Sequence, residues 1–412
     1  MPPSVTVERL QWADEALGTI PLPKRAMRIL SGFGSGLASR RGGPPGEVWA
    51  VGDRGPNLKI RTAVERYGLD ALKGVEAGAG AKVMPRLDLG PALARLRIDG
   101  GRVELVESFP ITDQSGRPVS GLPIPAGAHA QCEPALDLDG NLLGPDPSGL
   151  DTEGLVALAA GGFWAGDEYG PSLVRLDQAG KVLLRIVPEG VELPGAAYPV
   201  EARLPAIAGK RQLNRGFEAL ALSPDERWLF LAFQSPLAHP DESPHRQARH
   251  IRFWRLDAAT GEVAGQYLYP LDPPESFRRD NEKERIGWSD LKVSELVCIG
   301  EDRFIVLERA SETTKLYEVT LAGALALPPE HLDVATRPTL EELSGRGGLG
   351  ALPVLAKRLL FSSDDAPEVA ADLEGVAILS PSELLLVSDN DFGVEDAETS
   401  VWRLRFASDL FG

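Results

Sequence analysis

The 412-residue chain is poor in cysteine and in long apolar runs. Cys132 and Cys298 are its two cysteines, too few for a disulfide framework, so we expect both thiols to be unpaired and structural. The longest uncharged stretch near the centre, residues 154–166, is much shorter than the roughly 20 residues that span a bilayer. The sequence therefore predicts neither a disulfide-stabilised scaffold nor a transmembrane helix.

Positive charge is also scarce. Lys plus Arg number 43 against 60 for Asp plus Glu, which gives a formal net charge of −17. A nucleic acid requires a basic stripe, and an anionic membrane attracts clustered Lys and Arg, neither of which is visible. We expect no nucleic-acid partner and no membrane partner. An anionic substrate would need a local basic patch or a bridging metal.

The N-terminal segment MPPSVTVERL lacks a basic stretch followed by an apolar one, so no export signal is visible in it. The default expectation is a cytoplasmic protein, or a periplasmic or secreted one if a leader was removed. We expect a monomer.

What the chain does contain is a repeated pattern. Residues 151–170, DTEGLVALAAGGFWAGDEYG, place acidic residues and a glycine before an apolar run and a second acidic pair after it. Similar copies open at Glu218, Glu295 and Glu374, and a weaker copy without the Glu spans residues 35–54. Strands of the type SLVRLD, RFWRLD, KLYEVT or VWRLRF follow several copies.

A unit of about four short strands, repeated at several tens of residues, indicates a β-propeller. We predict an all-β fold with one propeller domain over residues 1–412. About six four-stranded blades are expected, because propellers have about 4 to 8 and a degenerate copy could sit between Leu325 and Pro367. A strand within residues 5–20 should close the ring by pairing with the last blade. Insertions, partly helical, are predicted near residues 59–83, 110–149, 273–292 and 325–367.

The topology of a blade predicts where the acidic residues meet. The first strand lies beside the central channel, and the loop between the second and third strands returns to the end where the first begins. Carboxylates crowded at that end raise one another's pKa unless a cation lies among them. Oxygen ligands favour hard divalent cations, Ca²⁺ before Mg²⁺. The predicted metal ligands are Asp53, Glu153, Asp167, Glu168, Glu218, Glu295, Glu374, Asp389 and Asp391, and no organic cofactor is predicted.

Two loops offer weaker signals. Asp137, Asp139 and Asn141 stand at alternate positions, as in a calcium loop, but the closing Glu is missing, so we favour a hairpin turn. Residues 236–250 hold three of the five histidines, and we expect an exposed loop there because the prolines oppose a helix. His129 is expected to be solvated or locally bonded.

The chain resembles the phytase-like family described as "esterase-like activity of phytase", from about Ser31 to Phe406. The resemblance lies in DTEGLVAL with FWAGDEYG, NRGFEALALSPDERWLFLAFQSPL, SELVCIGEDRFIVLERA and LEGVAILSPSELLLVSDNDFG. It implies a β-propeller and a calcium-dependent hydrolase of phosphate or carboxylic esters. Propeller phytases hold several Ca²⁺ ions in an acidic channel mouth, with Lys and Arg binding the phosphates of a small anionic substrate.

Three interpretations remain open. In the first, Ca²⁺ assists ester hydrolysis. In the second, a lactonase-type propeller uses one central Ca²⁺ and needs fewer basic residues. In the third, the propeller is non-catalytic and binds calcium for stability or presents a surface to a protein, or each Glu accepts backbone N–H bonds from a neighbouring blade. For the first, the expected catalytic residues are Glu153, Glu218, Glu295 and Glu374, and the expected substrate-binding residues are Arg54, Arg215, Arg309, Lys59 and Lys315.

Overall fold

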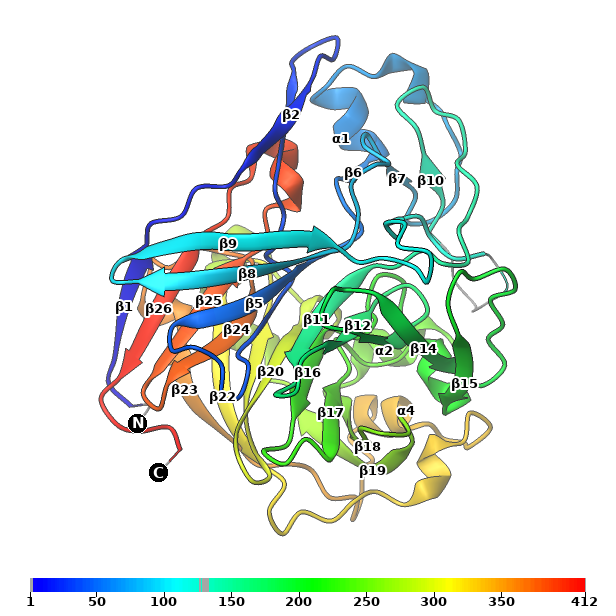
Figure 1. Ribbon diagram of the computed structural model, residues 1–412. Helices are drawn as coiled ribbons and strands as arrows, with labels where there is room; N and C mark the ends of the chain where they lie inside the picture. The colour runs from blue at the N-terminus through cyan, green and yellow to red at the C-terminus, as the bar shows by residue number, and fades with distance from the viewer. Residues whose placement is uncertain (1–2, 126, 128–132, 412) are drawn as a thin grey trace.

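The computed structural model describes residues 3–125, 127 and 133–411, and it is rich in strands with few helices (Figure 1). Its described residues form five sheets of four or five strands, and each visible sequence copy supplies one of them. This confirms the all-β prediction, but there is one sheet fewer than the estimate of about six. Cys132 and His129 lie outside the described residues.

The five sheets share one strand order, with each strand antiparallel to the next. The first strands are β4 (Gly36–Ala38), β11 (Thr152–Ala157), β16 (Ala219–Leu222), β20 (Lys292–Gly300) and β24 (Leu373–Ser380). The second strands are β5 (Glu47–Gly52), β12 (Phe163–Asp167), β17 (Trp228–Ala232), β21 (Arg303–Arg309) and β25 (Glu383–Ser388). The third strands are β8 (Ala92–Asp99), β13 (Ser172–Leu176), β18 (His250–Asp257), β22 (Thr314–Thr320) and β26 (Val401–Phe406). The fourth strands are β9 (Arg102–Pro110), β14 (Val182–Pro188), β19 (Val263–Pro270), β23 (Lys357–Ser362) and β1 (Val5–Leu10). A fifth strand, β15 (Val200–Leu204), pairs in parallel with β14.

The first strands form a closed ring. β11 contacts β4 and β16, β20 contacts β16 and β24, and β24 contacts β4. Glycines permit this approach, because a Cβ at Gly154 would stand 1.8 Å from the carbonyl oxygen of Glu218, and one at Gly36 would stand 2.5 Å from that of Glu153. The five first strands therefore surround one central channel.

Hydrophobic packing joins the neighbouring sheets. Five clusters lie between the five pairs of neighbours, including the pair formed by the last sheet and the first. Between the third and fourth sheets, the rings of Phe230 and Phe304 lie 4.5 Å apart between centroids. Each such side chain contributes about 1.5–3 kcal/mol when fully buried. The strand periodicity thus buries both faces of the inner strands between sheets.

The N-terminal strand β1 completes the last sheet. It pairs antiparallel with β26, from Val5 opposite Phe406 to Leu10 opposite Val401. This confirms the expectation that an N-terminal strand closes the ring.

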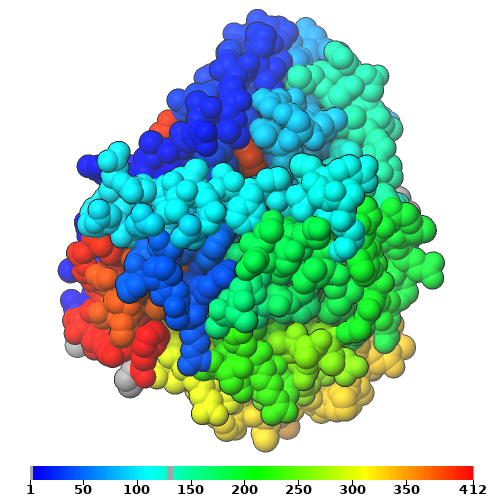
Figure 2. Space-filling model, viewed as in Figure 1, coloured from blue at the N-terminus to red at the C-terminus, as the bar shows by residue number. Residues whose placement is uncertain are grey.

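A smaller layer, which we call the cap, covers one end of the ring (Figures 1 and 2). Its own cluster includes Ile29, Tyr67, Leu72 and Leu136. In the space-filling view the blue and teal cap rests directly on the ring. The cap comprises β2 (Ala16–Ile20), β3 (Met27–Leu30), β6 (Leu58–Lys59), α1 (Ile60–Glu65), η1 (Asp70–Leu72), β7 (Lys82–Val83) and β10 (Ala135–Leu136).

Short helices occupy most of the other segments between strands. Residues 325–367, considered for a sixth blade, instead supply β23 and the helix α4, which packs near β18. Among the described residues, none of the helices combines the length and the apolar composition that a bilayer-spanning helix requires. The helices are η2 (Ala206–Lys210), α2 (Glu242–Gln247), η3 (Pro274–Ser276), α3 (Arg278–Lys283), η4 (Trp288–Asp290), η5 (Pro329–Leu332), α4 (Leu340–Gly345), η6 (Ser363–Asp365) and η7 (Asp391–Asp396).

The expectation of an exposed loop over residues 236–250 was wrong. α2 lies there, with Pro244 and His245 buried. Asp241 caps this helix by accepting a hydrogen bond from the Ser243 N–H at 2.8 Å. Pro244 stands in the first turn, where its missing N–H costs no helical hydrogen bond.

The turn at Asp137 has the form that we favoured. Asp137 Oδ1 accepts the backbone N–H groups of Asp139 and Asn141, at 2.9 and 2.8 Å. Leu136 and Leu142 pair across it as an antiparallel bridge. The aspartate is thus occupied as a turn-forming acceptor.

Candidate functional site

The acidic residues of the repeats meet at the capped end of the channel. Thr152, at the start of β11, pairs with Asp167, at the end of β12, so the first strand begins where the second ends. Besides burial, the negative charge of Glu218 helps to raise the pKa of Glu153, and that of Glu374 helps to raise the pKa of Glu218, so the three side chains lie near one another. The structure therefore brings glutamates from three sheets to one mouth.

Three carboxylates form the densest group, which we call the carboxylate triad: Asp53, Asp151 and Glu153. One oxygen from each lies within 4.8 Å of the others. Asp53 accepts the Gly55 N–H at 2.9 Å, whereas half-buried Glu153 has no hydrogen-bond partner among the described residues. Burial raises the pKa of Asp53 to about 7. Burial and the neighbouring carboxylates also raise the pKa values of Asp151 and Glu153.

Two further carboxylates extend the triad toward the third sheet. Glu168 is 2% exposed and neither of its oxygens accepts a hydrogen bond within the described structure. Glu218 accepts a hydrogen bond from Gln234, while its other oxygen has no such partner. Burial, followed by repulsion from Glu168 and Glu374, raises the pKa of Glu218 to about 8. The protonated form of Glu218 is thus favoured at neutral pH unless a metal ion binds beside it.

The fifth sheet adds Glu374, Asp389 and Asp391 to the same mouth. Burial raises the pKa of Asp389, and Asp391, Asp53 and Glu374 raise it further by repulsion. A Cβ at Gly34 would stand 2.4 Å from the Cα of Asp389, so the segment before β4 holds this aspartate tightly. The ring of acidic residues therefore continues across the junction of the last and first sheets.

Arg54 lies buried among the carboxylates. Its guanidinium forms ion pairs with Asp151, with Glu133 at 2.6 Å and with Glu168 at 3.5 Å, and the residue is 4% exposed. It also stacks over the Tyr169 ring at 5.0 Å. Arg54 thus neutralises part of the acidic charge, a position that differs from an open substrate-binding arginine.

A second group of cations, the cationic sector, faces the carboxylates from the third and fourth sheets: Arg215, Lys292 and Arg309. Burial lowers the pKa of Lys292 to about 8, and the charges of Arg309 and Arg215 lower it further. Arg309 is held by Ser294 at 2.9 Å, Asp372 at 2.8 Å and Glu374. Arg215 and Lys292 make no side-chain hydrogen bond or ion pair within the described residues.

Three predicted site residues, Asp167, Lys315 and Lys59, lie elsewhere. Asp167 forms an ion pair with buried Arg185 at 2.7 Å and accepts the Asp151 N–H at 2.8 Å. Lys315 donates to Asp272 at 3.0 Å beneath η3, and Lys59 is an exposed residue of the cap. The structure does not bring these side chains to the carboxylate triad.

Glu295 braces the channel. Its oxygens accept the N–H groups of Leu37, on the first sheet, and of Leu296, both at 3.1 Å. Burial raises its pKa, while N–H groups including that of Val376 act in the opposite direction. This is the arrangement of the structural alternative, in which a glutamate binds backbone from a neighbouring blade.

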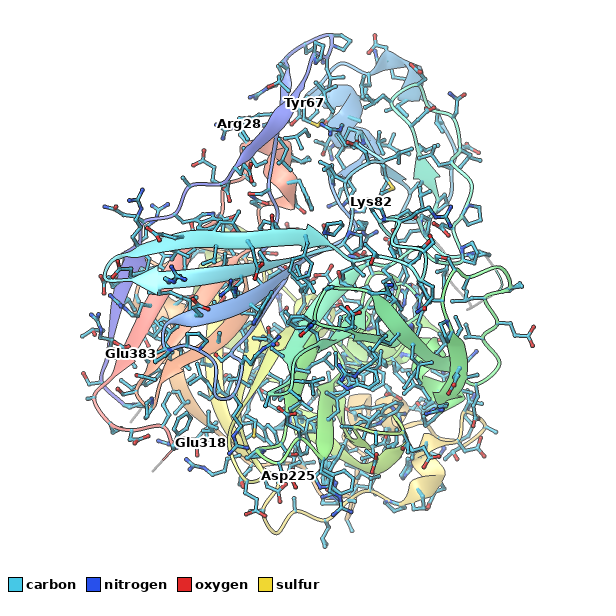
Figure 3. All side chains as sticks on the ribbon, viewed as in Figure 1. Arg28, Tyr67, Lys82, Asp225, Glu318 and Glu383 are labelled. Atoms are coloured by element: carbon cyan, nitrogen blue, oxygen red, sulfur yellow. The ribbon has the colours of Figure 1, made fainter. Side chains whose placement is uncertain are left out.

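Several residues of the site escaped the sequence prediction. Asp151, Glu133, Lys82, Lys292 and Gln234 all lie in it. A signal existed for Lys292, which stands three residues before Glu295 as Arg215 stands three before Glu218. Lys82, labelled in Figure 3, comes from the cap. The cap lies outside the repeated pattern, so no equivalent position in another copy pointed to this lysine.

These residues fit a hard divalent cation. The buried oxygens of this site that lack a hydrogen-bond partner within the described structure include Asp151 Oδ2, both oxygens of Glu168, Glu218 Oε2 and Gln234 Oε1. Each is an acceptor, and leaving such atoms unsatisfied is costly. Carboxylate and amide oxygens are the ligands that Ca²⁺ takes. Arg54 forms ion pairs with two of them, Asp151 Oδ2 and Glu168 Oε2, so the other three acceptors carry this argument most directly.

The sequence matches a known family over most of its length. The phytase-like family described as "Esterase-like activity of phytase" matches residues 29–392. An uncharacterised secreted protein of the fungus Arthroderma benhamiae is 26% identical over 334 residues, which cover 71% of the present chain and 61% of that protein. The present chain therefore matches less than two thirds of that relative.

Solved structures resemble the chain only distantly. A calcium-binding protein, regucalcin, from Agrobacterium tumefaciens is 12% identical with a TM-score of 0.34, and 96% of each chain is covered. A gluconolactonase from Xanthomonas campestris is 10% identical with a TM-score of 0.33, covering 98% of this chain and 99% of that one. Likenesses at this level say nothing about activity here.

Proposed function

Because the chain belongs to the phytase-like family, we propose that it is a calcium-dependent hydrolase of phosphate or carboxylic esters, with its site at the capped mouth of the channel. The observation that carries this proposal is the pairing of two features. Buried carboxylate oxygens without hydrogen-bond partners lie beside cations that lack ion-pair partners among the described residues.

The carboxylates and the cations occupy separate parts of the mouth, and this arrangement supports binding of a small anionic ester. Asp53, Asp151, Glu153, Glu168 and Glu218 would hold the metal ion, which when bound neutralises substrate charge and polarises the ester. Arg215 and Lys292 are available to bind an anionic group of the substrate. We propose that the protein acts as a monomer on this substrate.

A lactone or simple carboxylic ester is the second candidate substrate. Arg54 and Arg309 are already paired with carboxylates, which leaves fewer cations for phosphate than the sequence suggested. This observation favours a substrate with little negative charge. Comparing initial rates on p-nitrophenyl phosphate, p-nitrophenyl butyrate and a γ-lactone separates the two candidates.

The metal requirement is tested by chelation. We expect EDTA to abolish hydrolysis of the preferred substrate and Ca²⁺ to restore it, because the carboxylates need a cation to coexist in ionised form. Full activity in EDTA would remove the metal from the function.

Glu153→Gln tests the site itself. The substitution removes one unpartnered carboxylate, so we expect at least about a hundredfold loss of turnover, as for loss of other charge-stabilising groups. The matched control is Glu104→Gln, an exposed residue of β9, which should retain full activity. Wild-type turnover in Glu153→Gln would contradict the assignment.

The compartment is part of the proposal. The fungal relative is described as secreted, and we extend that location to this protein in place of the default cytoplasmic expectation. Extracellular calcium sites work at about 10⁻⁴–10⁻³ M Ca²⁺. A calcium dissociation constant in that range, measured by calorimetry, would agree with an extracellular location. A much smaller dissociation constant would not require that location.

A further inference from the structure

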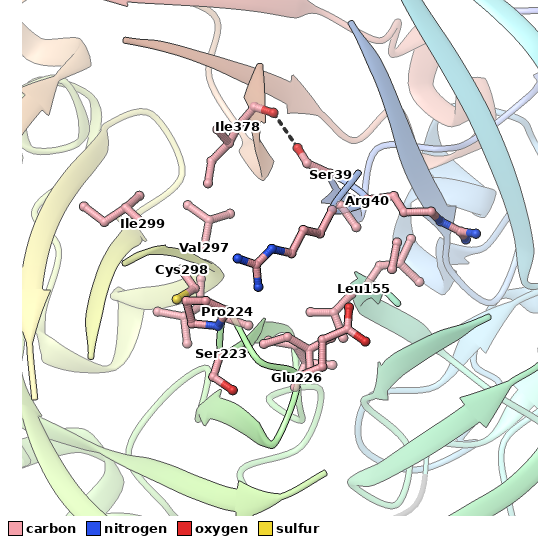
Figure 4. A pocket seen from close by; sticks show the side chains of 18 of the residues that line it. Ser39, Arg40, Leu155, Ser223, Pro224, Glu226, Val297, Cys298, Ile299 and Ile378 are labelled. Carbon is pink, nitrogen blue, oxygen red and sulfur yellow. Dashed lines mark hydrogen bonds between the residues drawn. The ribbon is translucent and has the colours of Figure 1, made fainter. Parts of the chain in front are cut away.

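The opposite end of the channel holds a separate cavity of about 480 Å³ (Figure 4). All five first strands contribute to its walls, at the ends farthest from the carboxylate triad. Most of the lining is aliphatic, with Leu155, Val297 and Ile378 among the contributors. Cavities of about 300–1,000 Å³ with apolar walls and few polar groups are the usual size of small-molecule sites.

Glu295 separates this cavity from the acidic mouth. Its carboxylate binds the N–H groups of Leu37 and Leu296, and both leucines line the cavity. The Glu295 side chain is fully buried. A molecule in the cavity would therefore not reach the carboxylate triad.

The cavity is locally basic in a protein with a net charge of −17. Arg40, Arg41 and Glu226 are the charged residues that line it. Arg40 stacks on Trp49 and Phe163, with centroid distances of 5.1 and 5.0 Å, while Glu226 accepts the Ala159 N–H at 2.7 Å. Among the described residues that line the cavity, two arginines thus face one acidic group.

Arg41 is the cation available to a ligand. It is exposed and makes no side-chain hydrogen bond or ion pair among the described residues. Burial raises the pKa of the Cys298 thiol, which donates to the Gly300 carbonyl at 3.0 Å, and the charges of Asp302 and Arg41 act on it in opposite directions, so Arg41 and Cys298 lie near each other. A guanidinium beside an apolar hollow matches an anionic head joined to an apolar tail.

We propose that this cavity is a binding site for a small amphipathic carboxylate, whose charged group pairs with Arg41 and whose apolar part fills the channel. The site is independent of ester hydrolysis at the capped mouth. Cys298 provides a local reporter, since a bound ligand would cover its thiol.

Octanoate and octanamide are suitable probes, because they share a tail and differ in charge. By calorimetry we expect octanoate to bind about tenfold more tightly than octanamide, because only octanoate can form a charge-assisted contact with Arg41. Arg41→Gln should remove that difference. The control Arg9→Gln, an exposed arginine of β1 away from the cavity, should preserve it. Equal affinities in the wild type, or an unchanged preference in Arg41→Gln, would overturn the proposal.

The location is tested separately through Cys298. In a Cys132→Ser background, octanoate should slow the reaction of Cys298 with a thiol reagent at least about tenfold at saturation. The Glu153→Gln substitution should leave this protection unchanged. An unaltered thiol reaction during saturating octanoate binding would place the carboxylate elsewhere and refute the cavity site, whatever the outcome of the hydrolysis assays.

Discussion

Acidic residues at equivalent positions of the repeats have different environments. Glu153 has no hydrogen-bond partner among the described residues, whereas Glu295 binds backbone N–H groups of two sheets. Asp167 is neutralised by Arg185. A carboxylate can hold a metal only where its oxygens are not already saturated, so Glu153 and Glu168 are better candidates than Glu295 or Asp167.

Glu295→Gln distinguishes bracing from catalysis. The amide replaces one acceptor oxygen with a donor that faces backbone N–H groups, so we expect the free energy of unfolding to fall by about 1–3 kcal/mol. Turnover per folded molecule should be retained. Denaturant unfolding and active-site-normalised rates measure the two effects. Unchanged stability with lost turnover would instead make Glu295 catalytic.

His250 contributes a pH dependence far from the acidic mouth. Ser344 Oγ accepts the Arg249 N–H at 2.8 Å and lies 2.9 Å from His250 Nδ1, so the hydroxyl proton is free to point at the ring. Burial lowers the pKa of His250 to about 4, and the charges of Arg249 and Lys357 lower it further.

The direction of this change in stability follows from the difference in the pKa of His250 between the folded and the unfolded chain. The unfolded chain takes up the His250 proton near pH 6.5 and the folded chain only near pH 4, so stability is lost as pH falls between these values. We expect the melting temperature of His250→Gln to fall less than that of the wild type from pH 7 to pH 4. Parallel melting curves over this range would show that His250 does not carry the effect.

At the scale of the element, the first strands depend on glycine. The Glu-Gly pairs at residues 153–154 and 374–375 place an acidic side chain at the mouth and then let the next strand approach. The same short sequence therefore serves the site and the packing of the ring.

Gly154→Ala should be strongly destabilising. The added methyl would stand 1.8 Å from the Glu218 carbonyl oxygen, so β11 and β16 must separate, at a cost of about 1–3 kcal/mol or more. The matched control is Gly144→Ala, where a Cβ would meet nothing within 4 Å. Chemical denaturation of both variants checks this expectation. Equal stability of the two would mean that the first strands are not in close contact.

At the scale of the molecule, the ring is closed by β1. Its pairing with β26 supplies the outer strand of the last sheet, and Leu10 is 3% exposed. Without β1, β26 would present an unpaired edge.

Deleting residues 1–10 should therefore weaken the whole ring. Loss of buried Leu10 alone is expected to cost about 2–5 kcal/mol, and the lost hydrogen bonds add to it. We expect a lower melting temperature and a greater tendency to aggregate, measured by calorimetry and light scattering. A control that replaces exposed Arg9 with Gln keeps the strand and should melt like the wild type. Unchanged melting after the deletion would show that closure does not depend on this pairing.

The sequence alone determined the all-β class, the repetition of short strands and the convergence of Glu153, Glu218 and Glu374, because strand periodicity and the order of acidic residues are local properties. The number of sheets, five where about six were predicted, came from the tertiary structure. It also signalled closure by an N-terminal strand. Only the tertiary structure decided which carboxylates remain unpartnered, that Arg54 is buried among them and that Lys82 arrives from the cap. Those features depend on contacts between residues far apart in the chain, and no local pattern encodes the partner that a side chain meets.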